Sequence, residues 1–482
     1  STSSYLSRKH PSLLYRFIHA FFEYYEKLPK SSHVLAIMSI LPWIRNITDH
    51  VYLSDRIRGT TRTIDVVRQF CRILSQGLCP IPILNDYIWK NMFGDSKLVP
   101  LLIDEVIAYA VDARNSNDPN WELIIAVISP SIEVCGELIK RLYAAVYLST
   151  HDHSTIISQL KIVEISVIVR MCLAVFFDLH TYAHQYAPDV FFFATLFVLH
   201  QALNIGTDLH QWCSTTVQLF LHKPNLTIDQ SDAINNTLNY ILGQRAHLLF
   251  GSKRDSEVQY DINQMLARAT SLEVFCDKLY QFMLDIGTSQ DILTRWRSRW
   301  CTSALDVAFR KVLLFQLRLI LIVGILLKVG LSDALALRVL KLIAKQKITN
   351  PAYLCLLLVS MARILEGLDN QLVLPPIIIW PLLCLSNLNN MVTYLPAVQC
   401  LSNVVLKLLL IKKDISELLE MLVSSRQMLE PYVSDFENAH EINFLIDNLE
   451  HLILFTYLKG IRVSQLRHLS VTCLKAALLN RV

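Results

Sequence analysis

The sequence predicts an all-α fold in which antiparallel helix pairs stack into a solenoid. Amphipathic segments of helix length recur along the 482 residues, and no alternating strand pattern is longer than a few residues. Hydrophobic residues make up 53% of the chain and charged residues only 18%, which indicates extensive burial between helices. Only 12 residues are glycine, whereas all-β and glycine-loop enzyme folds need glycine at many positive-φ turns.

Polar or proline-containing breaks separate the helical segments. They lie near residues 54–63, 79–86, 114–120, 149–155, 223–231, 251–260, 287–291, 347–351, 369–376 and 431–441. Their spacing, roughly 30 to 40 residues, is that of one helix pair in a HEAT or armadillo array. No glycine- or serine-rich linker divides the chain, so we expect residues 1–482 to form one continuous HEAT/armadillo-like α-solenoid, with 223–260 as the place where it would subdivide. The chain begins without a methionine, and we expect it to be a fragment of a longer protein.

The first strongly amphipathic helix is predicted at Ser12–Leu28, after Pro11. Its apolar residues fall on one face at helical spacing: Leu14, Phe17, Ile18, Phe21, Tyr25 and Leu28. The next helix begins near Ser32 and should end or kink at Pro42-Trp43, because proline lacks an N–H and clashes with the preceding turn. Further along, Leu372–Leu385 contains three prolines and is expected to be a proline-started helix rather than a central strand.

Two local signals predict helix ends near the middle of the chain. Gly251 follows the apolar letters HLLF and suits the C′ position of a helix. Thr270 and Glu273 have the spacing of a capping box, which predicts a helix that begins at Thr270. Neither signal implies chemistry.

The most apolar stretch is Lys311–Lys345, and its first half resembles a membrane span. A spanning helix needs about 20 nearly uninterrupted apolar residues. The longest run here, Leu319–Leu327, is about half that length, and Arg318 precedes it. Gly330 then suits the C′ position of a first helix, and an amphipathic second helix follows. The stretch therefore predicts a helix pair, which disfavours an integral membrane protein.

Charge and cysteine usage limit the classes of function. The net charge is +4 on 45 basic and 41 acidic residues, so no global field favours nucleic acid as a partner. The 11 cysteines form no C-x-x-C pair, which predicts reduced, buried thiols in a cytosolic protein. No signal peptide is visible, and the N-x-T matches at Asn46, Asn225 and Asn235 are interpreted as chance.

No motif of catalysis or cofactor binding is found in the sequence. His180 and His184 have the i,i+4 spacing of two zinc ligands, but Thr181 stands where H-E-x-x-H requires glutamate. We therefore predict no metal site there. The sequence contains no P-loop, dinucleotide fingerprint or nucleophile elbow, so no cofactor is predicted.

Two basic clusters are candidate surfaces for a partner or an anionic lipid. In the first, Arg295 and Arg299 share one helix face while Trp296 and Trp300 share the next. The simpler interpretation places the tryptophans in the core and the arginines in solvent. In the second cluster, Arg338, Lys341 and Lys345 lie on one face of a helix, where a solvated face is again the simpler interpretation.

Several stretches resemble, in order and spacing, the region of neurofibromin and the fungal Ira proteins that follows their GTPase-activating and lipid-binding domains. They are the helix that ends in Pro42-Trp43, Tyr87–Asp112, Ala187–Gly206, HLLFGSKR, RATSLEVFCDKL, RLILIVGILLKVG and YLKGIRVSQLRHLSV. The chain departs from the family at Leu317-Arg318, where the family usually has Pro-Arg. Divergence from neurofibromin favours the Ira branch.

The resemblance implies a segment of a Ras GTPase-activating protein, a negative regulator of Ras and, in fungi, of Ras/cAMP signalling. Catalysis in that class uses an arginine finger, which the family carries in an upstream domain and for which no motif is found here. We therefore expect a non-catalytic scaffold that forms a homodimer, with Ras bound by the parent's catalytic domain. The resemblance also implies a cytoplasmic parent that associates peripherally with membranes. The alternative is an independent helical-repeat adaptor that binds peptides, like a transport receptor.

Arg318 provides a test of the predicted helix pair. In a solenoid it would lie between repeats and bond to a helix end or a neighbouring carboxylate, so Arg318→Leu should leave unpaired partners and destabilise the fold by roughly 1 to 3 kcal/mol. The thermal melting temperature measures this. An unchanged melting temperature would mean that Arg318 is merely solvated.

Overall fold

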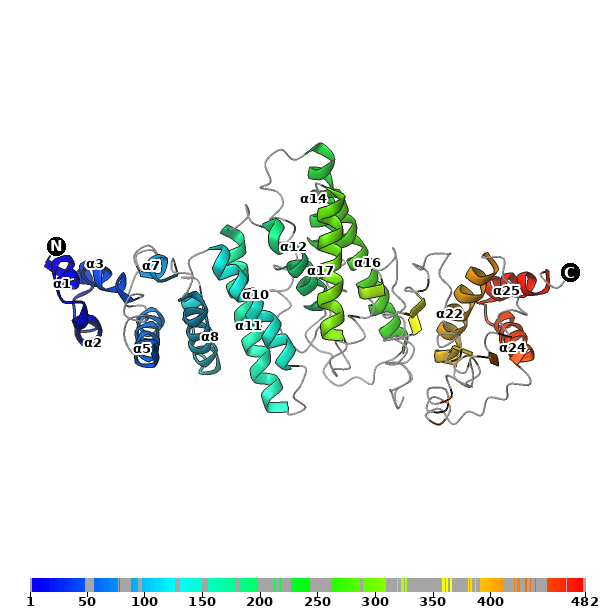
Figure 1. The fold of residues 1–482 in the computed structure, drawn as a ribbon, viewed down its shortest axis with the longest axis horizontal. Coiled ribbons are helices and arrows are strands. Elements are labelled where there is room, and N and C mark those ends of the chain that lie inside the picture. The colour runs from blue at the N-terminus through cyan, green and yellow to red at the C-terminus, as the bar shows by residue number, and fades with distance from the viewer. Residues whose placement is uncertain are drawn as a thin grey trace. The chain divides into compact units, whose positions relative to one another are not determined.

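The computed structural model describes most of the first half of the chain and parts of the second (Figure 1). The described residues are 2–47, 56–76, 78, 88–93, 98–125, 131–149, 155–178, 183–197, 212, 217, 227–242, 262–286, 289–308, 391–410, 449–464 and 466–479, with isolated positions between 319 and 438. All regular secondary structure in these residues is helical. The all-α prediction is therefore confirmed for the described part of the chain.

The chain forms two compact units. The first comprises Ser1–Val190 and His200–Ala246, and the second comprises Phe191–Leu199 and His247–Val482. The helices that lie wholly in the first unit are α1 (Thr2–Lys9), α2 (Leu14–Tyr25), α3 (His33–Ile44), α5 (Arg56–Ser75), α7 (Lys90–Phe93), α8 (Val99–Asn115), α9 (Trp121–Ile125), α10 (Ile132–Ser149), α11 (Thr155–Asp178) and α14 (Ile228–Leu242). Two short 3-10 helices, η1 (Pro11–Leu13) and η2 (Lys30–Ser32), precede α2 and α3.

The second unit contains α16 (Ile262–Ile286), α17 (Gln290–Ala308), α22 (Met391–Leu410), α24 (Leu449–Ile461) and α25 (Arg467–Leu479). The residues of α12 (Ala183–Phe197) are divided between the two units. The expectation of one continuous array over residues 1–482 stays a prediction.

Helices α2 and α3 form an antiparallel pair. The Phe17 ring stacks on Trp43 with ring centroids 4.5 Å apart, and the Tyr25 ring stacks on His33 at the same centroid distance. The start of α2 therefore meets the end of α3, and the end of α2 meets the start of α3. Both nitrogens of the buried His33 ring also lie within hydrogen-bonding distance of backbone carbonyl oxygens, at Leu28 and Leu78. Pro42 lies in the last turn of α3, which ends at Ile44 as its position predicts.

Helix α5 runs in the same direction as α2. Tyr15 meets Thr63 near the start of both helices, and the Phe22 and Phe70 rings contact edge to face further along. Helix α8 continues this order. Glu105 of α8 forms an ion pair with Arg68 of α5. Asn120, which lies between α8 and α9, donates to the Ser75 carbonyl oxygen at the end of α5. Figure 1 shows α2, α5 and α8 following one another along the first unit.

Arginine–carboxylate pairs join neighbouring helices along their exposed edges. Arg72 of α5 pairs with Glu26, just beyond α2, at 2.6 Å, and Arg68 of α5 pairs with Glu105 of α8 at 2.9 Å. Arg141 of α10 binds Asp104 of α8 in a bidentate arrangement, and Arg170 of α11 pairs with Glu122 of α9. Each such pair contributes about 0.2 to 1 kcal/mol, because solvent screens it.

The interior of the first unit is apolar and closely packed around α8, α10 and α11. Cys135 and Cys172 are both buried there, and burial raises the pKa of both thiols. Gly136 lies against α12, where an added Cβ would come within 2.9 Å of the Tyr186 hydroxyl. That hydroxyl donates to the Ile132 carbonyl oxygen at 3.1 Å and so ties α12 to the start of α10.

In the second unit, aromatic side chains pack α16 and α17 around Phe191. The Phe191 ring contacts Phe282 of α16 edge to face at 6.2 Å and Trp300 of α17 at 5.6 Å. All three side chains are fully buried. Further along the chain, α22, α24 and α25 form a three-helix group in which the Tyr394 hydroxyl donates to the Thr456 carbonyl oxygen at 2.7 Å.

Several predicted boundaries are confirmed. The breaks at 114–120, 149–155 and 287–291 separate α8 from α9, α10 from α11, and α16 from α17. The seven cysteines that the structure describes are buried, as predicted. In the apolar stretch, the described positions Leu319, Ile322, Val323 and Leu326 are buried. Among the described helices, none is both long and apolar enough to cross a membrane.

Three predicted boundaries are wrong. Residues 56–63 lie within α5 rather than in a break; the buried stripe of Thr63, Val67, Phe70 and Leu74 begins at the last of these residues, and the helix extends ahead of it because arginine is a good helix former. Helix α16 begins at Ile262, so Thr270 and Glu273 lie inside the helix, where the backbone N–H groups that a capping box would bind are already paired. Leu28 is 36% exposed because α2 ends at Tyr25, ahead of Pro29.

The contact between α24 and α25 at Gly460 can be tested by substitution. A Cβ at Gly460 would clash with the Ser470 hydroxyl oxygen and would lie 3.3 Å from the Tyr394 hydroxyl. We expect Gly460→Ala to destabilise the protein by about 1 to 3 kcal/mol through overpacking, although alanine is the better helix former. Urea denaturation followed by circular dichroism measures the change. Adding Ser470→Ala should recover most of the loss, and a destabilisation that persists in the double variant would contradict the clash.

Candidate functional site

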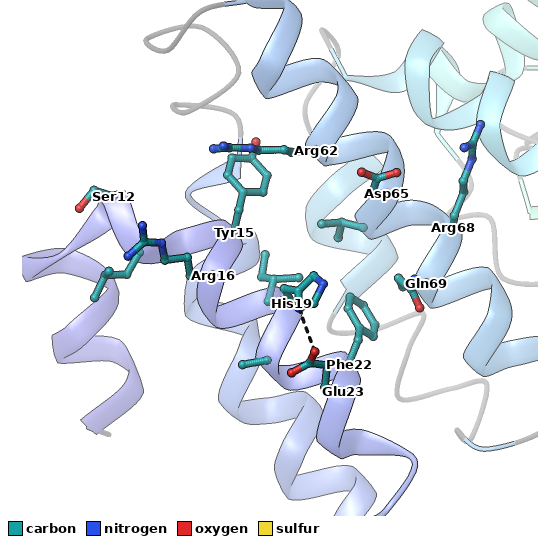
Figure 2. A pocket seen from close by; sticks show the side chains of 14 residues that line it. Ser12, Tyr15, Arg16, His19, Phe22, Glu23, Arg62, Asp65, Arg68 and Gln69 are labelled. Carbon is teal, nitrogen blue, oxygen red and sulfur yellow. Dashed lines mark ion pairs between the residues drawn. The ribbon is translucent and has the colours of Figure 1, made fainter.

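A groove of about 960 Å³ lies between α2 and α5 in the first unit (Figure 2). Its floor is apolar and formed by Ile18, Phe22 and Val66, all buried. Its polar lining comes from Ser12, Tyr15, Arg16, His19 and Glu23 on the α2 side and from Arg62, Asp65, Arg68 and Gln69 on α5. The volume is at the upper end of the range usual for ligand pockets.

Helical spacing brings these side chains to one groove. On α5, Arg62, Asp65 and Gln69 are spaced i, i+3 and i+7, so they lie along a single face. On α2, Arg16, His19 and Glu23 repeat the same spacing. Since α2 and α5 run in the same direction and pack through their apolar stripes, the two polar rows flank the groove along its length (Figure 2).

Tyr15 and Arg62 form the first end of the groove. The Arg62 guanidinium lies over the Tyr15 ring, with Cζ 5.3 Å from the ring centroid. The Tyr15 hydroxyl and Thr63 Oγ1 are 3.2 Å apart. Burial raises the pKa of the Tyr15 phenol, and the Thr63 hydrogen bond and the Arg62 charge oppose that rise. The neutral phenol ring provides a platform for the Arg62 guanidinium.

The charges in the groove differ in how they are paired. Arg68 is held by Glu105, and His19 Nδ1 lies 3.6 Å from Glu23 Oε1. Arg16, Arg62 and Asp65 are exposed, and none of them makes an ion pair with another residue in the described part of the chain. Gln69 Oε1 is buried and accepts no hydrogen bond from the described residues. The groove thus presents two arginines and one carboxylate to a ligand, beside a buried amide oxygen.

This arrangement suits the binding of a ligand. The groove has an apolar floor and an arginine, Arg62, that lies over the Tyr15 ring. Burial favours the neutral form of the Tyr15 phenol by raising its pKa. In the described residues, no group of three or more His, Cys, Asp or Glu side chains could hold a metal ion. Pairing of exposed arginines with acceptors across a helix groove is typical of peptide and protein recognition.

The structure places the first predicted basic cluster on α17. Trp296 and Trp300 are buried while Arg295 and Arg299 are exposed, so the predicted division between core and solvent is confirmed. Whether these arginines contact a partner or a lipid stays a prediction. The structure does not describe Gly251, Arg318, Gly330, Arg338, Lys341, Lys345 or His180, nor the side chain of His184.

The residues of the groove were not predicted as a site from the sequence. Arg62 falls in a stretch that is predicted to be a break between helices, so the sequence does not place it on one helix face with Asp65 and Gln69. The i, i+3, i+7 spacing of these three residues is the signal that could have indicated a polar helix face. Their juxtaposition with α2, more than 40 residues earlier, depends on helix stacking.

Two known proteins are similar to this chain along most of its length. The chain is 22% identical to the inhibitory regulator protein IRA2 of Saccharomyces cerevisiae over 435 residues, which is 87% of this chain and 14% of that protein. It is 19% identical to inhibitory regulator protein IRA1 of the same yeast over 483 residues, covering 94% of this chain and 15% of that protein. The chain is therefore similar to two Ira proteins along most of its length. It spans about a seventh of the length of these Ira relatives, and no protein-family profile matches it.

The contact between Arg62 and Tyr15 predicts a pKa change of known sign. Arg62→Gln removes the positive charge that lowers the pKa of Tyr15 and keeps much of the side-chain bulk, so the Tyr15 pKa should rise further. Titration of ring-labelled tyrosine by NMR measures it, with Tyr15→Phe to assign the signal. Arg16→Gln is the matched control and should leave the Tyr15 pKa unchanged. A fall in the Tyr15 pKa on Arg62→Gln would contradict the contact.

Proposed function

We propose that this chain is a non-catalytic scaffold segment of an Ira-like regulator that inhibits Ras by stimulating its GTPase. The observation that carries the proposal is similarity along most of the chain to two proteins named as inhibitory regulators. The resemblance to the neurofibromin and Ira class supplies Ras as the target and GTPase activation as the activity of the whole protein. In this proposal Ras is bound by a catalytic domain outside the chain.

The scaffold is a HEAT/armadillo-like array. Two features of the first unit support this architecture: α2 and α3 are antiparallel, and α2, α5 and α8 follow one another in the same direction. A repeated antiparallel pair whose first helices align is the arrangement of stacked helical repeats. We extend the array over residues 1–482 as one continuous domain of the parent protein.

The array also contributes to a homodimer of the parent in the cytoplasm, which associates peripherally with membranes. Its surface supports this part of the proposal, because stacked helices expose long faces able to bury the roughly 800 Å² per partner of a standard interface. Arg295 and Arg299 on the exposed face of α17 are candidates for such a contact, together with the predicted basic face of Arg338, Lys341 and Lys345.

A GTPase assay tests the division of labour. The purified chain should leave the rate of GTP hydrolysis by Ras at its intrinsic value, whereas a protein that contains the chain and the upstream catalytic domain should raise it by about 10³- to 10⁵-fold. Light scattering after size exclusion of the same two proteins measures the oligomeric state. Stimulation of Ras by the chain alone would refute the scaffold role, and monomers of the longer protein would refute the dimer.

A further inference from the structure

We propose that the groove between α2 and α5 binds a peptide segment of mixed charge from a partner protein. In this assignment a carboxylate of the peptide binds between Arg16 and Arg62, and a donor side chain further along the peptide binds Asp65. The proposal goes beyond the scaffold function and does not depend on the similarity to the Ira proteins. It rests on the pairing of charges in the groove, on its dimensions and on its overall charge.

The cationic end of the groove is available and partly preorganised. Along α5, Arg68 and Arg72 are both held by carboxylates of neighbouring elements. Arg62, on the same helix, instead lies over the Tyr15 ring and makes no ion pair with a described residue. The aromatic platform restricts the guanidinium without neutralising it, which lowers the entropic cost of binding an anion.

The other end of the groove requires a donor. Asp65 is an exposed carboxylate without an ion pair among the described residues, and the nearby Gln69 Oε1 is buried without a donor from them. The exposed Asp65 carboxylate can accept hydrogen bonds from an N–H group of a ligand. Lysine, arginine, asparagine and glutamine side chains all carry such donors.

The distance between the two ends indicates the length of the ligand. At about 1.5 Å per residue of helix, Arg62 and Gln69 are about 10 Å apart along α5. A peptide in the polyproline II conformation covers that distance in about three residues and presents residues i and i+3 on the same side. The occupant is therefore a segment in which an acidic residue and a basic or amide residue are about three positions apart, and a single small anion would leave most of the 960 Å³ unfilled.

The balance of charge in the groove favours a peptide over a polyanion. Asp65 and Glu23 line the same groove as the arginines, so a row of phosphates would meet two carboxylates. A peptide of mixed charge meets complementary groups at both ends instead. The apolar floor of Ile18, Phe22 and Val66 suits aliphatic side chains between the two charged positions.

Fluorescence polarisation with a labelled peptide tests the proposal. The probe is an extended peptide with glutamate and lysine separated by two alanines, measured at low salt against the whole chain. Saturable binding that weakens at least tenfold in Arg62→Glu is expected. Replacing the probe's glutamate by lysine should restore binding to Arg62→Glu and weaken binding to the unsubstituted protein. Circular dichroism melting of each variant establishes that it is folded.

Arg8→Glu is the matched control, because Arg8 is also an exposed helix arginine but lies on α1 and does not line the groove. It should leave the affinity of the probe unchanged. Equal losses in Arg62→Glu and Arg8→Glu would show that only net charge matters, and this result would overturn the groove as a site. Absence of saturable binding to the unsubstituted chain would overturn the proposal as well.

Discussion

Burial of an apolar stripe against neighbouring helices is the interaction on which the described structure depends. Ile18 of α2, Phe70 of α5 and Leu102 of α8 are each 1% exposed or less, and each belongs to a helix whose opposite face is polar. Because much of each helix is covered by elements close to it in sequence, a long chain can bury its apolar residues without one large core. The arginine–carboxylate pairs lie outside these stripes, at the exposed edges where two helices meet, and favour one alignment of each helix with its neighbour.

Much of the fold could be predicted from residue spacing. The apolar faces around Leu14 and Trp300 repeat at helical intervals, and the breaks at 114–120 and 287–291 contain the residues that end helices. The errors occurred where local polarity competed with long-range packing. Residues 56–63 are polar enough for a loop, yet α5 already begins at Arg56, ahead of the packed face that starts with buried Thr63 and Val67.

The candidate site could not be predicted in the same way. Its chemistry depends on which charges remain without a partner, and pairing is a property of neighbouring helices rather than of the sequence pattern. Arg62 and Arg68 have similar local surroundings in the sequence, but Glu105 of α8 reaches only Arg68, while the Tyr15 ring lies under Arg62. Spacing could have placed both arginines on a helix, and only the stacked structure distinguishes the one that is available.

The paired arginines make the contacts at the helix edges sensitive to salt. The stripes that hold α2, α5 and α8 together are dry, whereas the pairs Arg72–Glu26 and Arg68–Glu105 are partly open to water and ions. Ions screen the pairs and leave the stripes intact. Higher ionic strength therefore weakens the contacts at the helix edges, while the apolar interior continues to hold the helices of the first unit together.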